Sequence, residues 1–123
     1  MDYKTYEKLP VSGQYYAALG VIDALAGKIG PDFELPSVKM GHKFPTMQIV
    51  YPVVFLMKCD EYLRANWMEE LYSEKTKYLN RILVNLIASI PEEGINHLDG
   101  AFIPTYYRAL REAREELQEE DNG

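Results

Sequence analysis

The chain has little cysteine for disulfide crosslinks and no apolar run long enough to anchor it in a membrane. It has 123 residues and one cysteine, Cys59, so a disulfide within the chain is impossible and we expect a reducing compartment. The most apolar run, residues 49–57, is nine residues long and contains Pro52. A membrane-spanning helix needs about 20 apolar residues. No apolar leader follows Met1, so we expect a cytoplasmic protein.

Composition and charge indicate one small domain with an acidic end. The hydrophobic fraction is 47% and the charged fraction 26%, which suits a single core that needs no disulfide or metal. The net charge is −6; residues 112–123 hold six acidic residues and one basic residue, and residues 1–111 hold thirteen and twelve. We therefore expect a helical domain over residues 1–111 and an acidic, fraying tail over 112–123. The low pI argues against strong nonspecific binding to nucleic acid.

Apolar residues recur with helical spacing in four segments separated by glycine and proline. The first runs from 14 to 29, with Ser12 as its N-cap and Gly30-Pro31 as its stop. Residues 30–45 read as a Pro/Gly-rich loop. The second helix starts between residues 46 and 51, has Pro52 in its first turn and ends near residue 71. The unbroken apolar run before Lys58 predicts burial on most sides, and a buried strand over 48–57 is the alternative.

The last two segments have clearer boundaries. The third runs from 74 to 89, with Ser73 as N-cap and Pro91 beyond its end. The fourth begins near Asn96, with Asn96 and Asp99 as candidate caps and Pro104 at its start or at a kink. Amphipathic segments without a convincing strand predict an all-α fold, a four- to five-helix bundle with the Pro/Gly-rich loop between its first two main helices.

Residues that could support catalysis are few and scattered. Cys59 falls on a predicted apolar helix face, where a packed thiol is typical. His42 and His97 are far apart and match no metal-ligand spacing. The adjacent pairs Asp60-Glu61 and Glu69-Glu70 point to different sides of a helix and cannot form a dyad within it. The sequence therefore predicts no catalytic site, no metal and no cofactor, and an enzyme is the least favoured class.

Tyrosines and basic residues are the features left for a surface role. The chain has ten tyrosines, a residue type favoured at interfaces, although most could line the edge of the core. Basic residues occur in the 30–45 loop and on the third and fourth helices. If these groups converge they form a phosphate-binding strip, and if they do not they are ordinary solvated faces. The nucleic-acid candidates are Lys39, Lys43, Lys75, Lys77, Arg81, Arg108 and Arg111.

Four stretches, taken in order, resemble a known family. They are residues 16–25 (YAALGVIDAL), Val50-Tyr51-Pro52, residues 78–83 (YLNRIL) leading to Ile90-Pro91, and residues 102–108 (FIPTYYR). Together they resemble the small subunit of type I CRISPR interference complexes, which is equivalent to the C-terminal helical domain of the large subunit. The resemblance spans roughly residues 14–111.

The resemblance implies a non-catalytic role. Such subunits stack along an RNA-guided complex and help to hold the guide–target duplex or the displaced DNA strand. The implied partners are other subunits of the ribonucleoprotein, DNA and further copies of the chain, and the tyrosines and the acidic tail are expected to contact neighbouring subunits. The alternative is a phage or mobile-element inhibitor or adaptor that binds a protein partner through an acidic, tyrosine-rich surface.

Overall fold

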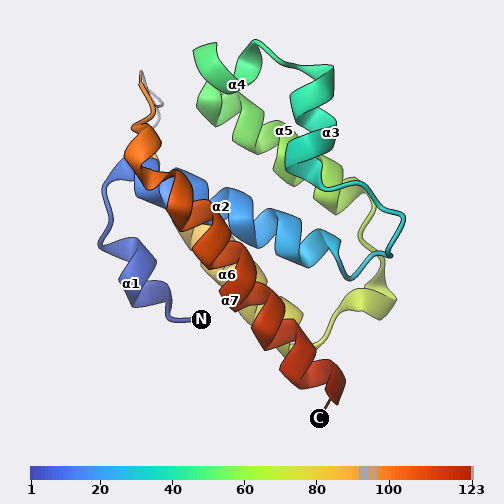
Figure 1. The fold of residues 1–123 in the computed structure, drawn as a ribbon. Coiled ribbons are helices and arrows are strands. Elements are labelled where there is room, and N and C mark those ends of the chain that lie inside the picture. Colours follow the sequence, from blue (N-terminus) through green and yellow to red (C-terminus); the bar gives the residue numbers. More distant parts are fainter. Residues whose placement is uncertain (92–94, 96, 123) are drawn as a thin grey trace.

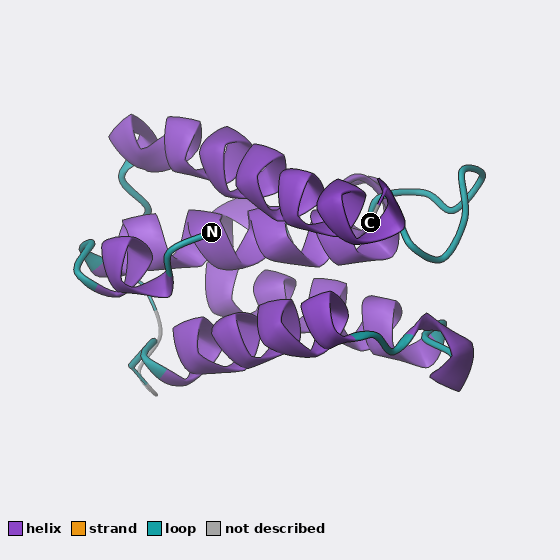
Figure 2. Ribbon diagram, turned by 90° about the horizontal axis from the view of Figure 1, so that it is seen from below, coloured by secondary structure: helices purple, strands orange, loops and turns teal. Residues whose placement is uncertain are grey.

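The computed structural model describes residues 1–91, 95 and 97–122, with the side chains of 120–122 excepted. Within these residues all regular structure is helical, which confirms the all-α prediction (Figure 2). Among them no helix combines the length and the hydropathy needed to cross a bilayer.

The first half of the chain forms five helices. A short helix, α1 (Tyr3–Glu7), precedes the long helix α2 (Val11–Ala26). Two further short helices follow, α3 (Pro36–Lys43) and α4 (Met47–Val50), and then the longer α5 (Pro52–Ala65). The helices α3 and α4 pack on α5, beside one part of α2 (Figure 1).

The described residues of the second half form two long helices and two short 3₁₀ turns. The turn η1 (Glu69–Leu71) leads into α6 (Glu74–Ala88), and η2 (Gly100–Phe102) leads into α7 (Ile103–Asn122). Both α6 and α7 pack on α2, and α7 makes the most extensive contact of any helix pair (Figure 1). Helix α2 thus lies among α1, α3, α5, α6 and α7.

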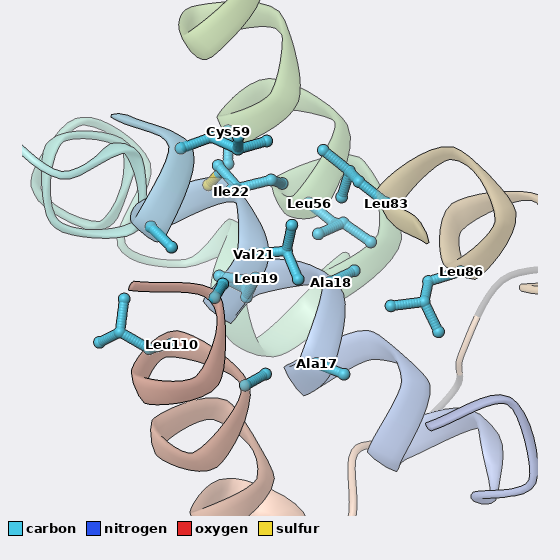
Figure 3. Packing of buried hydrophobic residues seen from close by; sticks show 14 of the residues in the cluster. Ala17, Ala18, Leu19, Val21, Ile22, Leu56, Cys59, Leu83, Leu86 and Leu110 are labelled. Carbon is cyan, nitrogen blue, oxygen red and sulfur yellow. The ribbon is translucent and has the colours of Figure 1, made fainter. Parts of the chain in front are cut away.

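Helix α2 is the centre of the core, with 14 of its 16 residues buried. Its side chains contact those of α5, α6 and α7 (Figure 3). Because the helix is buried on nearly all sides, the prediction of one apolar and one polar face for the first helix is wrong. The helix also starts earlier than residue 14. Pro10 occupies the N-cap position, and the predicted cap Ser12 instead accepts a hydrogen bond from the Asp99 amide at 3.0 Å. Ser12 therefore ties α2 to the segment before α7.

Small residues allow α2 and α7 to cross closely. Ala17 of α2 and Ala109 and Ala113 of α7 are fully buried. A Cβ on Gly20 would lie 2.6 Å from the Tyr106 carbonyl oxygen, closer than such atoms can approach. The Leu-Gly step of the family resemblance is thus a packing feature of this crossing.

The expected loop at 30–45 contains a helix, α3, which local sequence does not predict. Pro36 occupies its first turn, where the missing N–H costs nothing. Its capping group comes from a different helix, because the Asp23 carboxylate of α2 accepts hydrogen bonds from the Ser37 amide at 3.1 Å and the Ser37 hydroxyl at 2.5 Å. A tertiary contact therefore stabilises a helix in a segment whose sequence predicts a loop.

The predicted second helix is three separate elements, α4, α5 and η1. The break at Tyr51, with φ −130° and ψ 65°, follows from Pro52, whose ring disfavours helical geometry in the residue before it. Helix α5 ends at Ala65, where the Asn66 side chain donates to the Tyr62 carbonyl at 2.9 Å. Both halves of the apolar run 48–57 are helical, so the strand alternative is wrong.

The third predicted helix is confirmed as α6, with Ser73 as its N-cap in a capping box with Thr76. The fourth begins at Ile103, with Pro104 in its first turn and Asp99 capping η2 before it. The other candidate cap, Asn96, lies outside the described residues. Helix α7 continues through the expected boundary at residue 111, and buried residues beyond that boundary, Ala113 and Leu117, belong to the core.

Candidate interaction surface

Two of the seven basic candidates are held by acidic residues of α7. Lys75 Nζ lies 2.8 Å from Glu116, whose other oxygen accepts from the N-terminal ammonium. Arg108 Nε lies 3.1 Å from Glu112, and its guanidinium covers the Tyr6 ring at 5.6 Å. Their charges are compensated where α1, α6 and α7 meet, which leaves little net attraction for phosphate there.

The remaining basic candidates lie on three helices. Lys39 and Lys43 are one turn apart on α3, which packs on α2 and α5, and Lys43 lies 5.4 Å from the Phe44 ring centre. Lys77 and Arg81 lie on the exposed side of α6, and Arg111 lies on α7. Figure 1 places α3 on the other side of α2 from α6 and α7. No single strip joins the three groups within the described structure.

The side chains considered for chemistry have ordinary surroundings. The Cys59 side chain is fully buried, with its sulfur 3.6 Å from the Pro36 carbonyl oxygen, and burial raises the pKa of its thiol. His42 is exposed, with Glu34 at 3.8 Å, and His97 is exposed as well. Among the described residues, no three His, Cys, Asp or Glu side chains are grouped as metal ligands would be.

The apolar run expected to be buried on most sides is only partly buried: Pro52, Phe55 and Leu56 of α5 are covered, whereas several residues of α4 and the start of α5 are exposed. Ile49 is 81% exposed, Val50 52% and Tyr51 60%, and Val54 is exposed too. Helix α4 packs mainly on α5, and its Ile49 and Val50 side chains are left largely uncovered. The sequence pattern shows that these residues are apolar, but not whether another part of the same chain covers them. The exposed residues form a surface that the apolar pattern alone does not predict.

An apolar groove of about 420 Å³ is lined in part by Gln48 and Phe55, which are chain neighbours of the exposed Ile49 and Val54. Its floor comes from α2 and α5, one wall from α3 and α4, and the other from the segment before α7 and from α7 itself. Aromatic and aliphatic side chains predominate among its lining residues, which are Tyr15, Tyr16, Leu19, Ser37, Val38, Gln48, Phe55, Leu98, Ile103, Tyr106 and Tyr107. Two of these apolar residues, Ile103 and Tyr107, are exposed.

Asp23 holds the two walls of the groove together. Besides its bonds to Ser37 of α3, its carboxylate accepts from the Tyr106 hydroxyl of α7 at 2.5 Å. Burial raises the pKa of Asp23, and the bonds from Ser37 and Tyr106 and the charge of Arg114 oppose that rise. The raised pKa and the satisfied oxygens are typical of a buried structural carboxyl. Asp23 therefore sets the width of the groove.

The tyrosines divide between internal and surface positions. Tyr6, Tyr78 and Tyr106 donate to Glu112, the Met1 carbonyl and Asp23, respectively. Tyr51, Tyr72 and Tyr107 are exposed. Because Glu112 and Glu116 are also engaged internally, the acidic segment offers fewer free carboxylates to a partner than its composition predicts.

A smaller cavity of about 160 Å³ lies where α5 meets α6, lined by residues that include Leu25, Trp67 and Tyr72. Its one charged group, Arg64, is bonded to Asp60 at 3.0 Å and to Asn80 at 2.9 Å. This arrangement explains the local structure without a ligand.

Comparison with protein families, curated proteins and solved structures finds no match to the chain. The geometry of this surface is therefore the basis for assigning a function.

Proposed function

We propose that the protein is a non-catalytic binding subunit that packs its apolar surface against another protein. The observation that carries the proposal is the exposure of Ile49, Val50, Tyr51 and Val54 beside the groove. Contiguous exposed apolar residues are typical of interaction sites. Covering one large aliphatic side chain contributes about 1.5–3 kcal/mol, so a partner that covers several of them gains substantial affinity.

The charge distribution favours a protein over nucleic acid as the main contact. The chain carries a net charge of −6, which repels phosphate at long range. Lys75 and Arg108 are already paired, and the other basic candidates are divided among three helices. Contacts to DNA in an assembly would then be local and secondary, and protein packing would supply most of the attachment.

The assembly that the sequence resemblance names is a type I CRISPR interference complex. As a small subunit of such a complex, the chain would pack against its backbone subunits and against neighbouring copies. The test is reconstitution with guide-RNA-bound backbone subunits at low salt, followed by size-exclusion chromatography. We expect co-elution of the chain with the complex; elution of the chain alone would contradict this assignment.

A matched pair of substitutions locates the contact. Ile49→Glu places a charge on the proposed surface, and Val84→Glu places one on an exposed apolar position of α6. Both positions are solvent-exposed, so both variants should keep the unfolding midpoint of the parent. Ile49→Glu should abolish co-elution and Val84→Glu should preserve it. Equal behaviour of the two variants would contradict binding through this surface.

A further inference from the structure

Tyr107 joins the apolar groove to a second hollow on α7. Its side chain is 63% exposed and lines both depressions. The second hollow, of about 490 Å³, is lined by Tyr107, Leu110, Arg111, Arg114, Glu115 and Gln118. Tyr107, Arg111, Arg114 and Gln118 recur at helical spacing and so form one stripe along α7. That stripe is roughly 16 Å long, about three helical turns.

The two arginines of the stripe are charged groups that the fold does not use in ion pairs. Within the described structure, no acidic oxygen lies within 4.0 Å of Arg111 or Arg114, whereas Arg108 and Lys75 are paired. Arg114 lies close enough to Asp23 and Tyr106 for its charge to lower the pKa values of both. Among the described residues that line the hollow, Glu115 is the one acid. This part of an acidic protein is therefore locally positive.

We propose that the groove and the arginine stripe together dock an amphipathic helix of a partner protein, one that places apolar side chains in the groove and acidic side chains against Arg111 and Arg114. The proposal rests on the proposed function and names the chemistry of the partner. An apolar groove beside a straight charged stripe suits a helix with an apolar and a charged face. Arginine forms bidentate bonds with carboxylates, and tyrosine and arginine are the residues that dominate interface energetics.

Charge complementarity favours this occupant over a nucleic-acid strand. Two arginines and one glutamate give the hollow a small positive charge, which suits a few carboxylates better than a polyphosphate. The neighbouring groove is lined by residues such as Leu19, Val38 and Phe55, which favour aliphatic side chains. An amphipathic helix with an acidic face can place its apolar side chains in the groove and its carboxylates against the two arginines at the same time.

The test uses synthetic helical peptides and the isotope-labelled full chain. Three peptides of about 16 residues share one leucine face and carry glutamate, glutamine or lysine at the remaining positions. Binding is followed by amide chemical-shift changes. We expect the glutamate peptide to bind roughly tenfold more tightly than the lysine peptide and to lose affinity as salt increases. Its shift changes should cluster on the groove and on residues 107–118.

Charge-reversal variants identify the contacting cations. Arg111→Glu with Arg114→Glu should reverse the preference of the chain for the glutamate over the lysine peptide. Lys4→Glu with Lys8→Glu, which makes the same change in net charge at an exposed position of α1 and at its exposed C-cap residue, should leave that preference intact. Arg111→Gln with Arg114→Gln removes the charges without reversing them and should abolish the preference, even if reversal impairs folding.

Three outcomes would overturn the proposal. They are equal affinity for the glutamate and lysine peptides, shift changes confined to surfaces away from the groove, and preferential binding of a single-stranded DNA probe at Arg111 and Arg114. Concentration-dependent shifts of the same residues without peptide would identify a second copy as the occupant and would also overturn it. Co-elution with the backbone subunits that is lost in Ile49→Glu would still support the proposed function in any of these cases.

Discussion

Gly20 of α2 lies so close to the main chain of Tyr106 in α7 that a methyl group cannot fit between them. An ideal Cβ at Gly20 would be 2.6 Å from the Tyr106 carbonyl oxygen and 2.9 Å from the Leu110 nitrogen. These are backbone atoms, which cannot move aside as a flexible side chain can. The crossing of α2 and α7, and with it one wall of the groove, depends on the absence of a side chain here.

Gly20→Ala should therefore destabilise the protein by about 1–3 kcal/mol, the usual cost of forcing extra atoms into a packed core. Urea unfolding followed by circular dichroism measures this. Gly30→Ala is the matched control, because a Cβ at Gly30 meets no atom within 4 Å, and we expect a change close to zero. Equal midpoints for the two variants would show that the helices separate at little cost.

A second prediction concerns the bond between Asp23 and Tyr106. Tyr106→Phe removes the hydroxyl that donates to the buried carboxylate at 2.5 Å and should cost about 1–3 kcal/mol. Tyr107→Phe alters the adjacent, exposed tyrosine and should leave the free energy of unfolding unchanged. If Tyr106→Phe were as stable as Tyr107→Phe, the carboxylate would not need this donor, and Asp23 would not join the two walls of the groove.

Where local signals and burial coincide, the fold follows from the sequence. Helix α6 has a capping residue, Ser73, directly before an apolar stripe, and the structure reproduces both features. Helix α3 has no such signal, because the carboxylate that caps it is Asp23, fourteen positions before Ser37. The break at Tyr51 does have a local cause, which is Pro52. The sequence correctly predicts Pro52 in the first turn of a helix. The prediction of one continuous helix overlooks the effect of Pro52 on the residue before it.

The candidate surface is harder to predict than the fold because exposure depends on neighbouring helices. The sequence around Ile49 is apolar whether or not another helix covers it. The packing of α4 on the outer side of α5 leaves the Ile49 side chain uncovered. The positions of charged residues in the sequence likewise do not show which of them form ion pairs in the fold. The sequence identifies Lys75 and Arg111 as equivalent cations, whereas the fold brings Glu116 to Lys75 and brings no acid of the described residues within ion-pair distance of Arg111.

A third prediction is a pH dependence arising from Glu116. Burial raises the pKa of this carboxyl, but its bonds to Lys75 and the N-terminal ammonium outweigh that effect and hold its pKa below the ordinary value of a glutamate. A carboxyl whose pKa is lower in the folded state stabilises the fold above its unfolded pKa, and this stabilisation disappears as the pH falls through the folded value.

Glu116→Gln should thus be less stable than the parent at neutral pH, and the difference should shrink as the pH is lowered below about 4.5. Thermal unfolding across this pH range measures the difference. Glu70→Gln, on the exposed turn η1, is the control and should follow the parent closely. A difference for Glu116→Gln that stays constant with pH would contradict a role for its charge.

The last prediction concerns the thiol of Cys59, which is fully buried between α5 and the start of α3. Reagents such as iodoacetamide attack the thiolate, and burial both blocks access and raises the pKa of this thiol. Native protein should therefore label slowly, at a rate limited by opening of the structure, and should label promptly in urea. Ala65→Cys, at an exposed position on the same helix in a Cys59→Ala background, should label promptly without denaturant. Labelling of native Cys59 as fast as that of the residue-65 thiol would mean that α3 opens readily from α5, and the groove wall would then be mobile rather than held by Asp23.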